Sequence, residues 1–253
     1  MNHAFLDSPT PIAFAHRGGS FESENGLSAF EAVQRLGFRY IETDVRTTRD
    51  GVAFVFHDEN LGRMTGADRE IADLTVADLE YLTLPSGDKI PTLRETLEAF
   101  PNLRFNLDLK DDAAVEPVIA LIEELEAHRQ VCIASFSESR VSAVRDRFGP
   151  TVCTGLGVSG ILRVGLASTV SLNRHSWRRG ASVLQIPVRL SGVPVLTSKL
   201  VRKAHQAGLA VHVWTLNDRS TIESALDKGV DGVMTDRPHL LKEVLLSRGL
   251  WRE

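Results

Sequence analysis

Three carboxylates of this 253-residue chain lie on strand-like segments, where they could bind a metal ion. In the segment 40–45, Glu42 and Asp44 occupy alternate positions, so both carboxylates project from the same face of the strand. In the segment 104–109, Asp108 lies on the face opposite the apolar side chains. Three hard oxygen ligands, without a cysteine or histidine cluster of zinc spacing, favour Mg²⁺ or Ca²⁺. Such a cation would also remove the repulsion between the carboxylates.

Two histidines are placed to exchange protons beside such a cation. His16 and His57 each directly follow a short apolar segment, at the point where a strand enters a loop. One can act as general base and the other as general acid. Arg17 and Lys110 add positive charge suited to phosphoryl oxygens. The combination predicts displacement at a phosphodiester, in which charge on the phosphoryl oxygens is stabilised and a leaving alkoxide is protonated.

Each of these residues also has an ordinary structural explanation. A single buried histidine is more often a core residue than a catalytic one, and His212, deeper on its strand, is predicted to pack in the core. Glu42 and Asp44 could form ion pairs with a neighbouring arginine, and Asp108 could pair with Lys110. The joint occurrence of these residues at one end of several strands is what favours a functional site.

The elements that must position these residues alternate regularly along the chain. About eight strand-and-helix units in 253 residues predict an α/β fold, a single (β/α)₈ barrel over residues 1–253. The segment 58–91 interrupts the alternation and is predicted to be a small insertion after the second strand region. The strand-like runs are 12–15, 40–45, 52–56, 104–109, 131–134, 152–156, 183–186, 211–214 and 232–234, and the predicted helices are 27–36, 93–100, 113–125, 138–148, 198–207, 218–228 and 240–246.

Composition and charge exclude several classes of protein. With 43% hydrophobic and 25% charged residues the chain can bury a core, so it is not disordered. Its net charge of −4 argues against a dedicated nucleic-acid binder. The two cysteines suit a reducing compartment, and no segment has the pattern of a leader peptide or the length of a membrane span. We therefore expect a cytoplasmic protein.

At the residues named above, the chain resembles the glycerophosphodiester phosphodiesterase family. The resemblance covers nearly the whole chain, and the ordered set of motifs is specific although each fragment alone is weak. The matching text is AHRGG at 15–19, ENGLSAF at 24–30, GFRYIETDV at 37–45, TRDG at 48–51, VFHD at 55–58, LGRMT at 61–65, NLDLK at 106–110, VWTLN at 213–217 and GVDGVMTDRP at 229–238.

The resemblance implies a TIM barrel, one divalent cation, and hydrolysis of a glycerophosphodiester to sn-glycerol 3-phosphate and an alcohol. It makes His16 and His57 the acid–base pair, and it places Glu24 near the metal or His16 and Trp214 on the wall of the substrate pocket. The metal ligands it implies are Glu42, Asp44 and Asp108, and the phosphate contacts are Arg17 and Lys110.

The chain also departs from the family pattern. Asp108 replaces the more common Glu, Gln185 lies where some members have an acidic residue, and Ser23 replaces the usual Pro. The short insertion leaves no large domain over the substrate, so an open site could admit lipid-like diesters. The first alternative is therefore a phospholipase D-type enzyme acting on lysophospholipids or sphingolipids, which exposed apolar residues in 58–91 or 156–181 would favour. The second is a non-catalytic barrel that binds a phosphorylated ligand.

Overall fold

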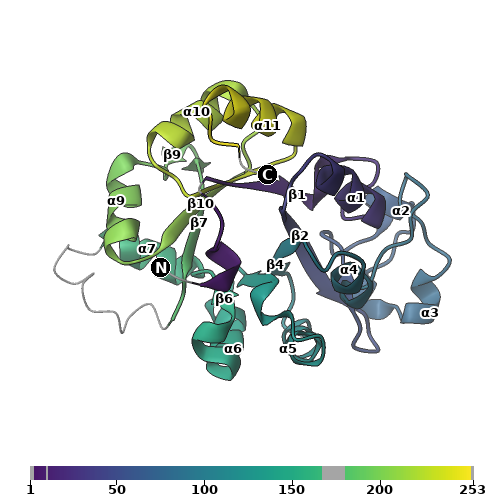
Figure 1. Cartoon of the computed structure of the whole chain (residues 1–253). Helices are drawn as coiled ribbons and strands as arrows, with labels where there is room; N and C mark the ends of the chain where they lie inside the picture. The colour runs from purple at the N-terminus through teal and green to yellow at the C-terminus, as the bar shows by residue number, and fades with distance from the viewer. Residues whose placement is uncertain (1–2, 10, 167–179, 252–253) are drawn as a thin grey trace.

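Eight parallel strands form a closed barrel in the computed structural model, which describes residues 3–9, 11–166 and 180–251 (Figure 1). Their order is β6-β5-β4-β2-β1-β11-β10-β7, and a bridge between Gly155 and Val183 joins the two ends of this series. The predicted (β/α)₈ barrel is confirmed. The strands are β1 (Ile12–His16), β2 (Tyr40–Thr47), β4 (Arg104–Leu109), β5 (Val131–Ala134), β6 (Cys153–Thr154), β7 (Val183–Pro187), β10 (Ala210–Trp214) and β11 (Gly232–Thr235).

Helices surround the barrel, and each turns an apolar face toward the strands. In α9, for example, Leu200, Val201 and Ala204 are buried while Lys199 and Arg202 face outward. The sequence predicts all of these helices except α7. They are α1 (Leu27–Arg35), α4 (Leu93–Ala99), α5 (Val115–Glu124), α6 (Glu138–Phe148), α7 (Val158–Leu166), α9 (Ser198–Gln206), α10 (Arg219–Asp227) and α11 (Pro238–Ser247).

The apolar run 52–56 is not a barrel strand, which corrects its place in the predicted alternation. It forms β3 (Ala53–Val55), which pairs antiparallel with β2. The reason is the length of the connection: a parallel crossover needs a dozen or more residues, whereas the tight loop between β2 and β3 allows only a hairpin. The insertion that follows packs on its own apolar cluster and contains α2 (Gly62–Thr65), the 3₁₀ turn η3 (Ile71–Asp73) and α3 (Val76–Leu79).

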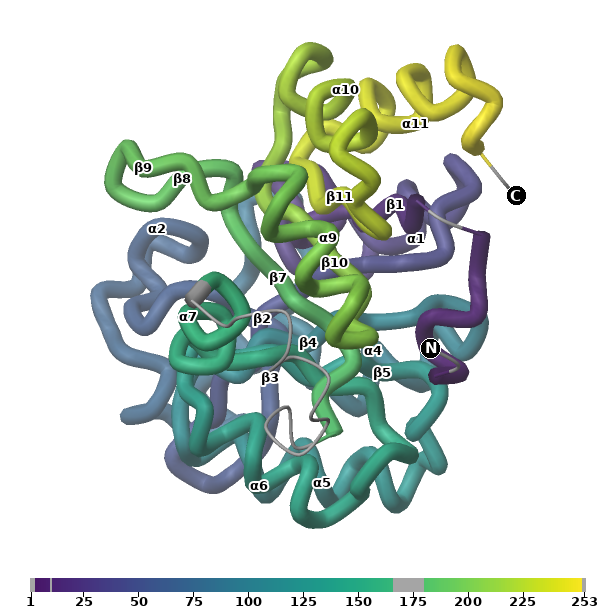
Figure 2. The backbone as a smooth tube through the Cα atoms, turned by 90° about the vertical axis from the view of Figure 1, so that its left-hand side faces the viewer, coloured from purple at the N-terminus to yellow at the C-terminus, as the bar shows by residue number. Residues whose placement is uncertain are grey.

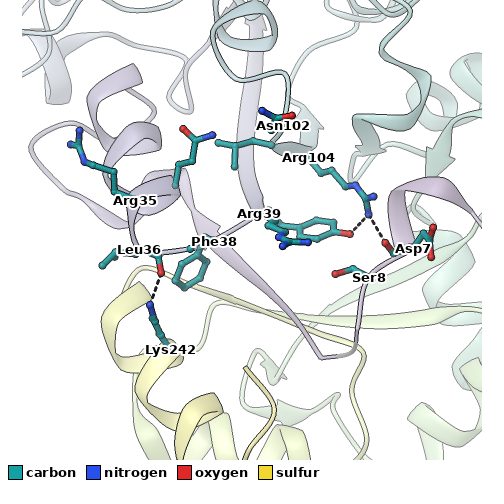
Figure 3. A pocket seen from close by; sticks show the side chains of 13 residues that line it. Asp7, Ser8, Arg35, Leu36, Phe38, Arg39, Asn102, Arg104 and Lys242 are labelled. Carbon is teal, nitrogen blue, oxygen red and sulfur yellow. Dashed lines mark hydrogen bonds between the residues drawn. The ribbon is translucent and has the colours of Figure 1, made fainter. Parts of the chain in front are cut away.

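The N-terminal end of the barrel is closed by the 3₁₀ turn η1 (Ala4–Leu6). Its Phe5 side chain is fully buried against the interior residues Phe14 and Tyr40. The Tyr40 hydroxyl donates to the Phe5 carbonyl at 2.7 Å, and the Arg104 guanidinium donates to the same carbonyl at 2.9 Å. Arg104 also donates to the Asp7 carbonyl at 3.1 Å (Figure 3). Access to the barrel interior is therefore from the C-terminal ends of the strands.

A cavity of about 620 Å³ lies outside this closed end. Residues of the α1–β2 turn, Asp7 and Ser8 after η1, and residues at the start of β4 line it. At its edge Lys242 donates to the Leu36 carbonyl at 2.7 Å (Figure 3). It is thus at the opposite end of the barrel from the histidines and carboxylates singled out in the sequence. Among the described residues, no helix combines the length and the apolar character that crossing a membrane requires.

Candidate active site

Charged residues gather where four adjacent strands, β4, β2, β1 and β11, reach their C-terminal ends. His16 is the last residue of β1 and pairs in register with Glu42 of β2. Asp44, two residues further along β2, pairs in register with Asp108 of β4. Strand register therefore brings together one histidine and the three carboxylates that the sequence singles out.

Asp44 is at the centre of this cluster and is 1% exposed. Its Oδ1 lies 2.8 Å from Lys110 Nζ, and its Oδ2 lies 3.0 Å from Arg17 Nε. Lys110 Nζ is also 2.6 Å from Oδ2 of Asp108. Burial acts to raise the pKa of Asp44, but Lys110 and Arg17 outweigh burial and hold this pKa below its ordinary value. Of the ion pairs considered in the sequence, those of Asp44 with Arg17 and of Asp108 with Lys110 are formed, whereas Glu42 has no arginine partner among the described residues.

Glu42 has no comparable cation beside it. Its Oε2 is 3.4 Å from His16 Nε2, and this buried oxygen has no hydrogen-bond partner among the described residues. Burial raises the pKa of Glu42 to about 8, and the negative charges of Asp44 and Asp108 act in the same direction. His16 and Lys110 favour the charged form of Glu42, but they do not offset burial and the neighbouring carboxylates.

These three carboxylates fit a divalent cation. All are at least nine-tenths buried and offer the hard oxygen ligands that Mg²⁺ and Ca²⁺ prefer, and the unpartnered Oε2 of Glu42 is one such donor. Lys110 now contacts both Asp44 and Asp108, and across the described part of the chain no three His, Cys, Asp or Glu side chains already converge as a metal-binding group. The donor set is present, and two of its members, Asp44 and Asp108, are paired with protein cations.

His16 is held by a carboxylate on the side away from Glu42. Its Nδ1 lies 2.5 Å from Oδ1 of Asp236, whose other oxygen accepts a hydrogen bond from Asn217 Nδ2 at 2.6 Å. Burial acts to lower the pKa of His16, but Glu42 and Asp236 outweigh burial and raise it. Because a carboxylate only accepts, Nδ1 carries a proton and Nε2 is the nitrogen that faces Glu42. The sequence pattern indicates no role for Asp236, which directly follows β11, or for Asn217, which lies three residues after β10.

His57, which does not lie on a barrel strand, is also held by a carboxylate. Its Nδ1 is 2.6 Å from Oδ1 of Asp58, whose other oxygen is 2.5 Å from Arg63 Nε. Arg63 in turn contacts Glu24 at 2.7 Å, and Glu24 accepts a hydrogen bond from Arg17 at 3.0 Å. Charged hydrogen bonds therefore connect His57 through Glu24 to the Arg17–Asp44 pair. The role of Asp58 could be inferred from its position next to His57, but nothing in the sequence indicates its contact with Arg63.

The loop after β1 is shaped by tight packing that explains how Arg17 reaches Asp44. Gly18 has φ +81°, and a Cβ at this position would lie 2.6 Å from the Ala29 Cβ, so only glycine fits. Asn25 accepts a hydrogen bond from the Thr43 hydroxyl at 2.7 Å and donates to Asp44 at 3.3 Å. The loop is thus attached to the strand that bears the carboxylates.

Gln185 and Trp214 lie on the other side of the mouth. The Gln185 amide donates to Asn106 Oδ1 at 2.7 Å and forms no hydrogen bond with the described residues of the charged cluster. Trp214 is partly exposed and packs edge-to-face on Phe136, with ring centroids 5.9 Å apart. His212, as predicted, packs in the core against Phe14, and burial lowers its pKa to about 4.

Comparison with known proteins decides the family. Residues 16–240 match the model of the glycerophosphoryl diester phosphodiesterase family. The chain belongs to this family. A Mycobacterium tuberculosis member named "Probable glycerophosphodiester phosphodiesterase 2" is 41% identical over 98% of this chain and 95% of its own length. The human lysophospholipase D GDPD1 is 26% identical over 91% of this chain and 85% of its own length.

Solved structures of other family members have the same barrel. The glycerophosphodiester phosphodiesterase of Thermotoga maritima superposes with a TM-score of 0.71 at 26% identity, covering 92% of this chain and 97% of that one. An Oleispira antarctica phosphodiesterase, crystallised in complex with the product sn-glycerol-3-phosphate, has a TM-score of 0.80. It is 23% identical and covers 96% of this chain and 99% of that one, so it supports the fold alone.

Proposed function

We propose that this glycerophosphoryl diester phosphodiesterase family member hydrolyses glycerophosphodiesters to sn-glycerol 3-phosphate and an alcohol, with His16 and His57 as its acid–base pair. The observation that carries the proposal is that both histidine rings are held in the same way, each by its own carboxylate. Each histidine is bound through Nδ1 to a carboxylate, Asp236 for His16 and Asp58 for His57. Each therefore has Nε2 available for proton transfer beside the same group of buried carboxylates.

The chemistry requires one proton acceptor and one proton donor on opposite sides of phosphorus. In the first step the substrate's glycerol 2-hydroxyl loses its proton to Nε2 of one histidine and attacks phosphorus. The bond to the alcohol group breaks, and the other histidine donates a proton to the departing alkoxide. Water then opens the cyclic phosphate with the two histidines in reversed roles, which regenerates both protonation states. Arg17 and Lys110 supply positive charge for the phosphoryl oxygens.

Glu42, Asp44 and Asp108 are the residues that would hold the divalent cation. When bound, Mg²⁺ or Ca²⁺ would stabilise negative charge on the phosphoryl group. The two cysteines are buried free thiols, which supports a reducing, cytoplasmic setting for the enzyme.

The direct test is release of sn-glycerol 3-phosphate from glycerophosphocholine by the purified protein. We expect release with Mg²⁺ or Ca²⁺ and none with EDTA, because Glu42 and its neighbours need a cation to remain charged together. Equal release in EDTA would refute the role of the cation. No release with any metal would refute glycerophosphocholine as a substrate and move the test to lysophosphatidylcholine.

Replacing Asp236 by asparagine is expected to lower kcat by about 100-fold with little change in KM, since asparagine can donate to Nδ1 and so favour the wrong tautomer of His16. Asn217, which donates to Asp236, should tolerate replacement by aspartate less well than by serine, because a second carboxylate would repel Asp236. Steady-state kinetics and ¹⁵N chemical shifts of the His16 ring measure both effects. An unchanged tautomer and kcat in Asp236→Asn would exclude this positioning role.

Lysophospholipids are a second candidate substrate, favoured by exposed apolar side chains in the two segments that the sequence singles out for this purpose. Tyr81 of the insertion is exposed, as are Val158 and Leu162 of α7. Trp214 and Phe136 add an aromatic surface at the mouth that could contact an acyl chain. Release of choline from lysophosphatidylcholine, compared with release from glycerophosphocholine, distinguishes the two substrates.

A further inference from the structure

Positive charge is concentrated in one continuous part of the chain. Residues 148–217 contain eight Lys or Arg and no Asp or Glu, although the whole protein has a net charge of −4. This part of the chain supplies β6, β7 and β10, which are neighbours in the closed barrel, together with α7 and α9. In Figure 2, α7, α9, β7 and β10 lie on the face toward the viewer. Five of these eight cations lie on described residues, and they make this side of the barrel basic, whereas the remainder of the sequence has more Asp and Glu than Lys and Arg.

Exposed apolar side chains lie at the mouth of the barrel on this same side. Val158 and Leu162 are one turn apart on α7 and are 43% and 59% exposed. Phe136, which follows β5, is 61% exposed and packs on Trp214. The backbone N–H of Val158 donates to the Phe136 carbonyl at 3.3 Å, so α7 begins beside this aromatic pair. The apolar half of the mouth is thus formed by β5, β6, β7 and β10, opposite the charged half.

A short hairpin after β7 extends this apolar surface. It consists of β8 (Arg189–Leu190) and β9 (Val193–Pro194), joined by a two-residue turn, and it projects beyond the neighbouring helices in Figure 2. Both turn residues have positive φ, the conformation that keeps a two-residue hairpin tight. Leu190 and Val193 flank the turn and are 61% and 64% exposed. Two aliphatic side chains exposed at the tip of a tight hairpin indicate a surface that contacts another apolar surface.

Exposed cations lie on the same elements as these side chains and on α9, which packs against α7. Arg163 of α7, Arg189 of the hairpin, and Lys199 and Arg202 of α9 are all exposed, and none forms an ion pair with another described residue. Arg189 donates to the Gly192 carbonyl at 2.6 Å, which holds its charge beside the turn of the hairpin. Cations beside exposed apolar side chains are complementary to a membrane surface, in which lipid phosphates lie above the acyl chains.

We propose that the β8–β9 hairpin and the exposed face of α7 attach the barrel mouth to a membrane surface containing anionic phospholipids. The aliphatic tips enter the boundary between headgroups and acyl chains, and the exposed cations contact lipid phosphates. A second copy of this chain is a poor occupant, because both copies would present the same positive charge. Nucleic acid would use the cations but leave Leu190 and Val193 without a role.

The test is sedimentation of the full-length protein with vesicles of equal parts phosphatidylglycerol and phosphatidylcholine. We expect the protein to bind these vesicles, to bind pure phosphatidylcholine much less, and to be released by added salt. Replacing both Leu190 and Val193 by Asp should weaken vesicle binding by about tenfold or more, since two apolar contacts are lost. A Lys199→Glu, Arg202→Glu double variant should weaken it to a similar extent.

Two matched variants control for surface changes elsewhere. Leu246→Asp alters an exposed apolar residue (55% exposed) in the last turn of α11, and Arg39→Glu alters an exposed cation of the α1–β2 turn. Both lie toward the closed end of the barrel and should bind vesicles like the wild type. Turnover of water-soluble glycerophosphocholine by the hairpin variant should be unchanged, which separates this proposal from the proposed function. Absence of wild-type binding, equal binding by the hairpin variant, or binding to an oligonucleotide but not to vesicles would overturn it.

Discussion

Turnover of glycerophosphocholine by a His57→Ala variant is expected to fall by about 1,000-fold or more, because the reaction loses its proton donor or acceptor in both steps. The fold should not change, since the His57 side chain is 34% exposed and packs in no apolar cluster. Binding of the divalent cation should persist as well, because the three carboxylates remain. Steady-state kinetics, a thermal unfolding curve and a metal titration measure these three properties.

The protein offers a matched control for this variant. His205 pairs with Asp231 at 2.7 Å, close to the 2.6 Å between His57 and Asp58, and its side chain is 42% exposed. It lies away from the charged cluster, so His205→Ala removes a similar histidine–carboxylate pair without touching the proposed site. We expect full activity from it. If both variants were equally active, His57 would have no part in the mechanism.

Replacing Glu42 by glutamine is expected to abolish metal-dependent turnover and, at the same time, to stabilise the metal-free protein. The pKa of Glu42 rises from an ordinary 4.5 to about 8 in the folded state. Between these values the folded protein binds one proton more than the unfolded chain, so its stability falls as pH rises. The loss reaches about 3 kcal/mol at pH 7. Glutamine keeps the shape of the side chain and does not ionise, so the free energy of unfolding of the variant does not fall in this way as pH rises.

Urea unfolding in EDTA at pH 5, 7 and 8 measures the effect, and the difference from wild type should grow across this range. Asp44→Asn is the informative comparison on the same strand. The folded-state pKa of Asp44 is lowered, so its charge stabilises the protein above the unfolded pKa, and asparagine should destabilise at neutral pH. Added Mg²⁺ or Ca²⁺ should stabilise wild type but not Glu42→Gln. Parallel pH dependence in wild type and Glu42→Gln would contradict our account of the cluster.

The barrel could be predicted because its strands and helices differ in hydrophobic period. The two errors have physical causes. The run 52–56 has the pattern of a buried strand, but sequence period does not distinguish a barrel strand from a hairpin partner. Helix α7 contains Gly160 and Gly165, which weaken a helical pattern; at Gly160 a Cβ would come within 2.9 Å of Leu156, so packing requires the glycine there.

The site was predictable only in part. Alternation within a strand reveals that Glu42 and Asp44 share a face, but not which cations lie opposite them. Lys110, expected to contact phosphate, pairs with Asp44 and Asp108 in this structure. The carboxylate that holds His16 comes from Asp236, 220 residues away, and no local pattern connects the two. Contacts of this kind depend on closure of the barrel and become visible only in three dimensions.

Closure also has a consequence for biosynthesis. Of the barrel strands, β1 leaves the ribosome first. One of its two neighbours is β11, so Ile12 cannot pair with Gly232 until β11 has been synthesised. Until then the inner face of β1 and its free edge have no permanent cover, a condition that favours slow folding and association between nascent chains. Chains terminated before β11 would lack both the closed barrel and Asp236. Asp236 can hold His16 only after β11 has been synthesised. We therefore expect an incomplete chain to be inactive.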